Sequence, residues 1–312
     1  MRFFRKKKKQ GAWLAMVLQR DGIVAASVRR GDGKPAVTLA SHYPGQANAE
    51  ALEKAGKDLH AANYRCTTVL GGGDYQIMAV EAPNVPPEER KAAMRFRLKD
   101  ILDFPVAEAS FDLVEIPLDP NAAVRPRQSV FAVASRNGTI RARQDLFQQA
   151  KVELGTIDIP EMAQRNLSSM LETDGRGIAM LSFGEDGGLL TVSCRGELYL
   201  SRRIDATLAQ LLDADHDRKH QAFDKITLEL QRSLDHFERQ FSFVGVAKLV
   251  LAPSGAQGLQ EYLSGNLYTR VETLDLAMLL DLARVPELLG AAAQQRFFVA
   301  IGAALREEGA AA

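Results

Sequence analysis

The sequence is poor in the features that define several protein classes. Its two cysteines, Cys66 and Cys194, lie far apart and form no Cys-x-x-Cys pair, which argues against a disulfide scaffold and favours a reducing compartment. Its 39 basic and 39 acidic side chains balance, so no net charge attracts nucleic acid. The most apolar window, residues 274–283, is interrupted by Asp275 and Asp281 and is shorter than the roughly 20 residues of a membrane-spanning helix. We therefore expect a cytoplasmic protein without a nucleic-acid partner.

Charge is uneven only at the start of the chain, where MRFFRKKKKQ places six cations next to two phenylalanines. The apolar stretch that follows runs directly into Arg20 and Asp21 and is more typical of a strand than of an export signal. One interpretation of the first ten residues is a solvated tail. The other is a segment that binds an anionic membrane, where each cation gains about 1 kcal/mol and aromatic side chains insert at the interface. The residues that would make this contact are Phe3, Phe4, Lys6, Lys7, Lys8 and Lys9.

Local catalytic and metal-binding motifs are lacking as well. The segment RRGDGKPA contains Gly-Lys without the spacing of a phosphate-binding P-loop, and no Gly-x-Ser-x-Gly turn occurs. His216 and His220 would share one face of a helix and could then bind a metal ion. Because no further His or Cys ligand supports such a site, we interpret this segment as a solvated loop. The sequence thus indicates no catalytic residue and no metal ligand.

What the sequence does contain is a repeated order of elements. The first part has apolar segments at 12–18, 23–30 and 36–43, and the second part has segments of the same kind at 178–183, 189–194 and 197–204. In each part an amphipathic segment and one more apolar segment follow, which predicts strand, strand, strand, helix, strand twice. Two related three-layer α/β halves with a cleft between them are implied. The helix of the second half has one apolar stripe that should face a core: Phe223, Ile226, Leu230, Leu234, Phe237 and Phe241.

An insertion interrupts the first half. Residues 83–117 have no counterpart in the second half and predict a helix from about Pro86 that ends before Pro105, followed by a strand. We interpret the insertion as a small extra subdomain that the folding of the duplicated core does not require. Four of its apolar residues at helical spacing are expected to be buried: Met94, Leu98, Ile101 and Leu102.

Four segments in order along nearly the whole chain carry a family resemblance: LKDILDFPVAEASFDLVEI, SVFAVASRNGTIRARQDLFQQAKVELGTIDI, LELQRSLDHFERQFSFVGVAKLVLAPSGAQGLQEYLSGNL and FFVAIGAAL. In this order they resemble the PilM family of type IV pilus assembly proteins, especially its MshI branch, which serves the mannose-sensitive haemagglutinin (MSHA) pilus. The resemblance implies an α/β, actin-like (duplicated ribonuclease H) two-lobed fold with a small FtsA-type inserted subdomain. It divides this chain into a basic tail at residues 1–10, a first lobe at 11–168 with the subdomain at about 80–125, and a second lobe at 169–312.

The resemblance also locates where a nucleotide would bind. Actin-like sites hold phosphates between two glycine hairpins, because the backbone N–H groups of such turns bind anions, and an Asp at each turn helps to hold the metal. The Asp and Gly of the first hairpin fall at Val17 and Gln19, and the second hairpin has Ser182 in place of Asp and keeps Gly184. Two carboxylates that follow Gly184 would repel a phosphate.

The adenosine-side loop departs from the family pattern in the same way. Pro253 replaces a glycine, and only Gly255 and Ala256 are retained. The vestigial nucleotide loops are therefore Gly184, Gly255 and Ala256, and we interpret the turn at Gly184 as a bend between strands. ATP with Mg²⁺ is disfavoured as a cofactor, and no cofactor is expected.

Finally, the resemblance implies a partner, the cytoplasmic N-terminal tail of a single-span inner-membrane pilus assembly protein that is PilN- or MshJ-like. An extended tail would dock on the inserted subdomain and its junction with the first lobe, with Arg95, Phe96 and Lys99 as partner-binding residues. We expect a scaffold of type IV (MSHA-type) pilus biogenesis, peripheral at the inner membrane, that does not hydrolyse nucleotide. The alternatives are an active actin-like ATPase that drives pilus assembly through interdomain closure and a sugar-kinase-like enzyme, and the missing phosphate loops disfavour both.

Overall fold

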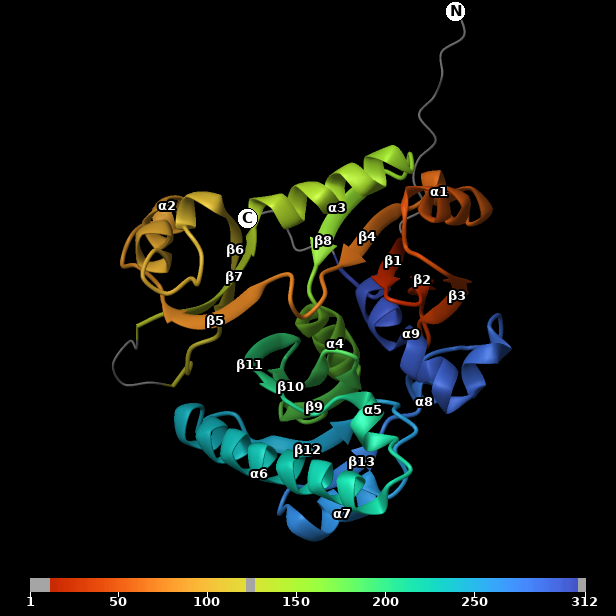
Figure 1. Ribbon diagram of the computed structural model, residues 1–312. Helices are drawn as coiled ribbons and strands as arrows, with labels where there is room; N and C mark the ends of the chain where they lie inside the picture. The colour runs from red at the N-terminus through yellow and green to blue at the C-terminus, as the bar shows by residue number, and fades with distance from the viewer. Residues whose placement is uncertain (1–11, 122–126, 308–312) are drawn as a thin grey trace, which may run out of the picture.

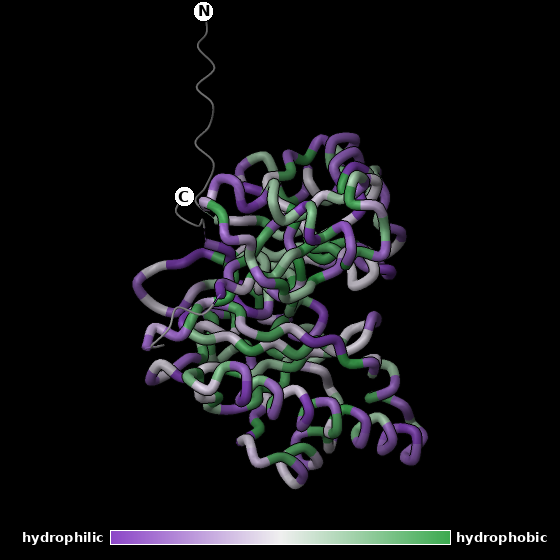
Figure 2. The backbone as a smooth tube through the Cα atoms, turned by 90° about the vertical axis from the view of Figure 1, so that its left-hand side faces the viewer, coloured by the Kyte–Doolittle hydropathy of each residue, from purple (hydrophilic) through white to green (hydrophobic). Residues whose placement is uncertain are grey.

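The structure of the protein is a computed structural model that describes residues 12–121 and 127–307. The described chain forms two lobes, each built on a five-stranded sheet, and a smaller subdomain with a three-stranded sheet (Figure 1). Apolar segments gather in the interior and hydrophilic segments at the periphery (Figure 2). Among the described residues, no helix is long and apolar enough to cross a membrane.

The first lobe is a mixed sheet with strand order β3-β2-β1-β4-β8. Its first three strands are antiparallel, whereas β4 and β8 join in parallel. Alternate residues of β2 enter two separate clusters of buried side chains, one with Ile23 and Ala25 and the other with Val24 and Ala26, because successive side chains of a strand point to opposite faces. The sheet is therefore covered on both faces. Its elements are β1 (Trp13–Gln19), β2 (Gly22–Arg29), β3 (Ala36–Pro44), β4 (Arg65–Val69), β8 (Leu154–Asp158), α1 (Ala49–Asp58) and α3 (Asn137–Gln149).

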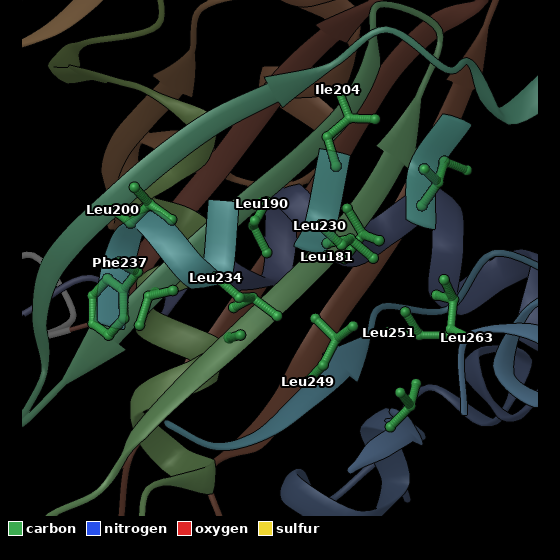
Figure 3. Packing of buried hydrophobic residues seen from close by; sticks show 14 of the residues in the cluster. Leu181, Leu190, Leu200, Ile204, Leu230, Leu234, Phe237, Leu249, Leu251 and Leu263 are labelled. Atoms are coloured by element: carbon green, nitrogen blue, oxygen red, sulfur yellow. The ribbon is translucent and has the colours of Figure 1, made fainter. Parts of the chain in front are cut away.

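The second lobe repeats this topology with order β11-β10-β9-β12-β13. The predicted apolar stripe of α6 packs on the sheet, with Leu230 beside Leu181 and Phe237 near Leu200 (Figure 3). The expectation that this stripe faces a core is confirmed. The elements are β9 (Gly177–Gly184), β10 (Gly187–Cys194), β11 (Glu197–Ile204), β12 (Val246–Leu251), β13 (Val271–Thr273), α6 (His216–Gln240) and α7 (Leu259–Asn266).

Two helices lie between the sheets and cross from one half of the chain to the other. α9 (Ala291–Ala304) packs on β1, β2 and β4 of the first lobe, and α4 (Pro160–Ser168) packs on β9, β10 and β11 of the second. One cluster of buried residues extends from the first sheet through both helices to the second sheet. The hydrophobic cores of the two lobes are therefore not separated by a division of the chain at residue 168. Each half of the chain contributes one helix to the core of the other lobe.

The subdomain lies beside both lobes. Its helix, α2 (Pro87–Leu98), covers one face of a sheet with order β5-β7-β6 and buries Met94 and Leu98 there. The strands are β5 (Gln76–Glu81), β6 (Ala109–Ile116) and β7 (Ser129–Arg136). Because β7 completes this sheet, the subdomain continues past the end at about residue 125 that the sequence suggested.

The other face of the subdomain sheet packs against the second lobe. Ile116 and Phe131 belong to the same hydrophobic cluster as Tyr199 and Leu200 of β11. Excision of the insertion would therefore expose apolar residues of the second lobe, and folding of the core without the insertion stays a prediction. A correction concerns Ile101, which was expected to be buried and is 49% exposed.

The helix α6 begins before the point that the sequence indicated. The side chain of Asp215 accepts hydrogen bonds from the backbone N–H groups of Asp217 and Arg218 and caps the helix. The segment from His216, interpreted as a loop, is therefore helical, and the rings of His216 and His220 stack with centroids 5.8 Å apart. Short helices complete the described chain: Ala61–Asn63, Val106–Glu108, Ser169–Leu171, α5 (Leu208–Leu211), α8 (Leu276–Leu279) and Pro286–Leu289.

Candidate functional site

The β1–β2 turn of the first lobe and the β9–β10 turn of the second lobe meet between the lobes. Arg20 Nε lies 3.1 Å from Glu185 Oε2, and Arg20 Nη2 lies 3.4 Å from Asp186 Oδ1. We call this contact the hairpin clasp. The Arg20 side chain is 76% exposed, so the ion pairs stabilise the fold by only about 0–1 kcal/mol. Their effect is to keep the two turns in contact.

The loop after β4 donates its glycine N–H groups to carboxylates of the protein itself. The Gly72 N–H donates to Asp186 Oδ2 at 3.1 Å, and the Gly71 N–H donates to Asp74 Oδ2 at 3.1 Å. Backbone N–H groups in such loops are donors that bind external anions in other proteins. Here an internal carboxylate from the second lobe takes this position.

A buried carboxylate, Glu161, stands at the start of α4 next to this loop. It is fully buried and accepts hydrogen bonds from Tyr75 Oη at 2.5 Å, Ser201 Oγ at 3.3 Å and Arg203 Nη2 at 3.3 Å. Burial, and next the Glu161 carboxylate, raise the pKa of Tyr75 well above its usual range. The three donors compensate the desolvation of Glu161 and connect α4, the β4–β5 loop and β11.

A second buried carboxylate fastens the end of α9 to the first sheet. Asp158, at the end of β8, is 5% exposed, and its Oδ2 lies 2.7 Å from Arg306 Nη1. The Arg306 guanidinium also lies 5.5 Å from the ring centroid of Trp13. This pair holds the C-terminal end of α9 against β8 and β1.

Val17 and Ser182, at the two positions where an actin-like site has Asp, have other roles here, and so does Gln19, at the position of a glycine. Val17 is a buried strand residue paired with Val24 in β1 and β2, and Gln19 is the last residue of β1. Ser182 Oγ donates to Gln164 Oε1 of α4 at 2.6 Å. The side chains of Val17 and Gln19 thus belong to the sheet, and that of Ser182 fastens the sheet to the central helix.

The retained glycines of the vestigial loops occupy chain reversals. Gly184 and Gly187 pair across a two-residue turn, and Gly187 has a φ of +110° at a point where an added Cβ would lie 2.8 Å from the carbonyl oxygen of Ile204. Gly255, two residues after Pro253, has a φ of +69°. Ala256 packs on the core of the second lobe. Backbone conformation explains Gly187 and Gly255, and packing explains Ala256, whereas nothing lies within 4 Å of a Cβ added to Gly184.

A groove lies at the junction of the first lobe and the subdomain. It has a volume of about 320 Å³ and lies between β8 and β6, beneath α3, which bridges the two parts (Figure 1). Among the described strands, β8 ends the sheet of the first lobe and β6 ends the sheet of the subdomain. The apolar lining comprises Leu70, Phe111, Val133, Ile140, Leu154, Ile157 and Ile159. The polar lining includes Ser110, Asp112, Ser135, Gln144 and Thr156.

The residues predicted to bind the partner lie on α2 and at its end, outside this lining. Phe96 is 80% exposed, and Lys99 is exposed at the end of the helix. Arg95 Nη1 donates to the carbonyl oxygen of Val106 at 3.0 Å, and its guanidinium lies 5.3 Å from the ring centroid of Phe111. The structure therefore places these three residues on an open helical surface next to β6.

Two further predictions concern the tail and metal ions. Phe3, Phe4 and Lys6, Lys7, Lys8 and Lys9 lie outside the described residues. Within the described residues, His, Cys, Asp and Glu side chains form no group of three or more that could hold a metal ion.

Two lobes with duplicated sheets and exchanged helices define an actin-like fold, as the resemblance implied. A solved structure described as the PilM–PilN type IV pilus biogenesis complex is similar, with a TM-score of 0.74, 19% identity and coverage of 94% of this chain and 98% of that chain. A Bacteroides thetaiotaomicron protein with an actin-like ATPase fold and unknown function gives a TM-score of 0.51 at 11% identity, covering 93% and 99%. At these identities the likeness establishes the fold. No protein-family model and no curated protein matches the sequence.

Sequence reasoning missed both the clasp and the buried Glu161. Arg20 was noted only as the residue that ends an apolar stretch, and the carboxylates after Gly184 only as groups that repel phosphate. A partial signal was available, because the tip of the first hairpin carries Arg20 and the tip of the equivalent hairpin carries two carboxylates. For Glu161 no signal existed, since an acidic residue in the first turn of a helix is usually a solvated one.

Proposed function

We propose that the protein is a cytoplasmic scaffold of type IV pilus biogenesis, of the MSHA type, that docks on the cytoplasmic N-terminal tail of a PilN- or MshJ-like inner-membrane protein. The observation that carries the proposal is the groove between β8 and β6, where the edges of two sheets face each other below α3. The similar solved structure is of a PilM–PilN complex, which supports a partner of this class.

The groove has the chemistry that an extended peptide requires. A strand that ends a sheet has backbone N–H and C=O groups available for an added strand, which supplies affinity independent of sequence. Pockets for alternate side chains then supply specificity. Ile140 and Ile157 offer apolar contacts, and Gln144 and Asp112 offer polar ones at the rim. A short tail with alternating apolar and polar residues fits this lining.

We further propose that the protein acts without hydrolysing nucleotide. Val17 and Ser182 stand at the two hairpin positions where actin-like sites have a metal-binding Asp, and the Asp186 carboxylate accepts the Gly72 N–H. A phosphate at this point would compete with an internal anion and meet the charges of two acidic side chains. The contact between the lobes here is made instead by Arg20 with Glu185 and Asp186.

The basic tail at residues 1–10 is proposed to hold the scaffold at the inner membrane. Six cations gain about 1 kcal/mol each at an anionic leaflet, and two phenylalanines can insert at the interface. This attraction would keep the groove near a partner that emerges from the same membrane.

The docking proposal is tested with a fluorescently labelled synthetic peptide of the N-terminal cytoplasmic tail of the PilN-like protein from the same organism. Ile140→Glu and Gln144→Glu should weaken binding by about tenfold or more, because the peptide must desolvate the added carboxylate. Arg141→Glu is the matched control, since Arg141 is exposed on the same helix and is not part of the groove lining. Wild-type affinity in both groove variants, or an equal loss in the control, would refute the groove as the docking site.

A further inference from the structure

The β4–β5 loop, residues 71–75, is fastened to the groove on one side. Arg143 Nη2 of α3 lies 3.2 Å from Asp74 Oδ2, and Ser135 Oγ donates to the carbonyl oxygen of Asp74 at 2.7 Å. Ser135 lines the groove, as does Leu70, which directly precedes the loop. The Arg143 side chain is only 14% exposed, and burial lowers its pKa. A partly desolvated pair of this kind holds its geometry better than a pair in open solvent.

The same loop is fastened to the second lobe on its other side. The Gly72 N–H donates to Asp186 in the hairpin clasp, and Tyr75 Oη contacts Glu161 and Arg203. The fit is close, because a Cβ added to Gly72 would lie 3.1 Å from Asp186 Cβ. A movement of the second-lobe hairpin away from this loop would therefore break the hydrogen bond between Gly72 and Asp186.

We infer that the β4–β5 loop couples the hairpin clasp to the groove, so that a closed clasp and a docked peptide favour each other. The identity of the peptide rests on the proposed function, whereas the coupling rests on the contacts of the loop. A peptide seated against Leu70 and Ser135 would fix the loop in the position that Asp186 also requires. By linkage, the clasp must then raise the affinity for the peptide by the same factor by which the peptide stabilises the clasp.

Hydrogen–deuterium exchange of the full chain tests the coupling without any partner. Asp186→Ala removes the acceptor of the Gly72 N–H, and Glu197→Ala is the matched control, since Glu197 is an exposed carboxylate of the same lobe that lies outside the hairpin clasp. We expect faster exchange in Asp186→Ala at residues 70–75 and also in the groove, at 140–144 and 154–159, with little change there in Glu197→Ala. Faster exchange confined to the loop and the hairpin would overturn the inference.

Peptide binding supplies the second measurement. With the labelled tail peptide described above, Asp186→Ala should bind about threefold to tenfold more weakly than wild type, and Glu197→Ala should bind as wild type does. The peptide should in turn slow exchange at residues 71–75. Equal affinities for all three proteins would overturn the coupling. If the wild-type protein binds no peptide, the proposed function is refuted, and the exchange experiment alone decides the coupling. Asp186→Asn, which keeps the size and loses the charge, replaces the alanine variant if that variant lacks the wild-type circular dichroism.

Discussion

Gly302 of α9 and Ala163 of α4 are in backbone contact, so that a Cβ added to Gly302 would lie 2.3 Å from the carbonyl oxygen of Ala163. The Gly302 carbonyl oxygen in turn accepts a hydrogen bond from Asn166 Nδ2 at 2.9 Å. This crossing joins the two helices that the lobes exchange. The position of one sheet relative to the other therefore depends on a residue without a side chain.

The first prediction is that Gly302→Ala destabilises the protein by at least about 1–3 kcal/mol, because backbone must shift to admit the methyl group. Gly265→Ala is the control, since Gly265 lies in α7 with no atom within 4 Å of an added Cβ, and it should gain up to about 1 kcal/mol from helix propensity. Urea unfolding followed by circular dichroism measures both free energies. Equal stability of the two variants would contradict the close crossing.

The second prediction concerns alkaline pH and Tyr75. Because the folded protein raises the pKa of this phenol above its ordinary value of 10.0, its contribution to stability is complete below pH 10 and is lost as the pH rises through and beyond that value. Tyr75→Phe should also lower the free energy of unfolding at pH 7 by about 1–3 kcal/mol, because Glu161 loses a donor.

Urea unfolding between pH 7 and pH 11 tests this, and the difference between wild type and Tyr75→Phe should shrink toward the alkaline end. The exposed Tyr268 provides the control through Tyr268→Phe. A difference between wild type and Tyr75→Phe that stays constant across this range would show that the phenol is not held neutral by the fold.

The third prediction is that the purified protein binds no Mg-ATP with useful affinity, because Val17 and Ser182 replace the metal-binding Asp of the two hairpins and Asp186 already accepts the Gly72 N–H. Isothermal titration is the direct measurement. Micromolar binding, or hydrolysis that a Gly184 substitution abolishes, would instead support an active ATPase.

The fourth prediction concerns the surface of α2. Phe96→Ala, and the double variant Arg95→Glu with Lys99→Glu, should reduce capture of the inner-membrane partner in a pull-down. The melting temperature should change little after Phe96→Ala, since Phe96 is 80% exposed. Leu228→Ala in α6 is a matched control, because Leu228 is 46% exposed on the other lobe. Normal capture by both α2 variants would restrict docking to the groove.

The fifth prediction is that deletion of residues 2–9 weakens co-sedimentation with vesicles that contain phosphatidylserine. Binding of the full chain should also fall as salt rises, since the Debye length shortens from about 10 Å at 0.1 M to about 3 Å at 1 M. Vesicles of phosphatidylcholine alone are the control. Unchanged sedimentation after the deletion would identify the tail as a solvated segment without a membrane role.

The repeated element order and the apolar stripe of α6 were predictable because both depend on periodicity along the chain. Alternation in β1 and β2, and the three- and four-residue spacing from Phe223 to Phe241, specify which faces are buried whatever they pack against. The same logic failed for Ile101, which follows the spacing of Met94 and Leu98 but comes after the last residue of α2. Helical periodicity predicts burial only as far as the helix continues.

The sequence alone thus determined the two related halves, the inserted subdomain and the loss of both phosphate-side carboxylates, because these are properties of order and residue type. Only the tertiary structure decided which helix covers which sheet, how Arg20 meets Asp186, and why Glu161 is buried with three donors. These contacts join residues that are 166, 86 and 40 positions apart in the chain. Their geometry follows from the crossing of α4 and α9, and no local pattern in the chain encodes that crossing.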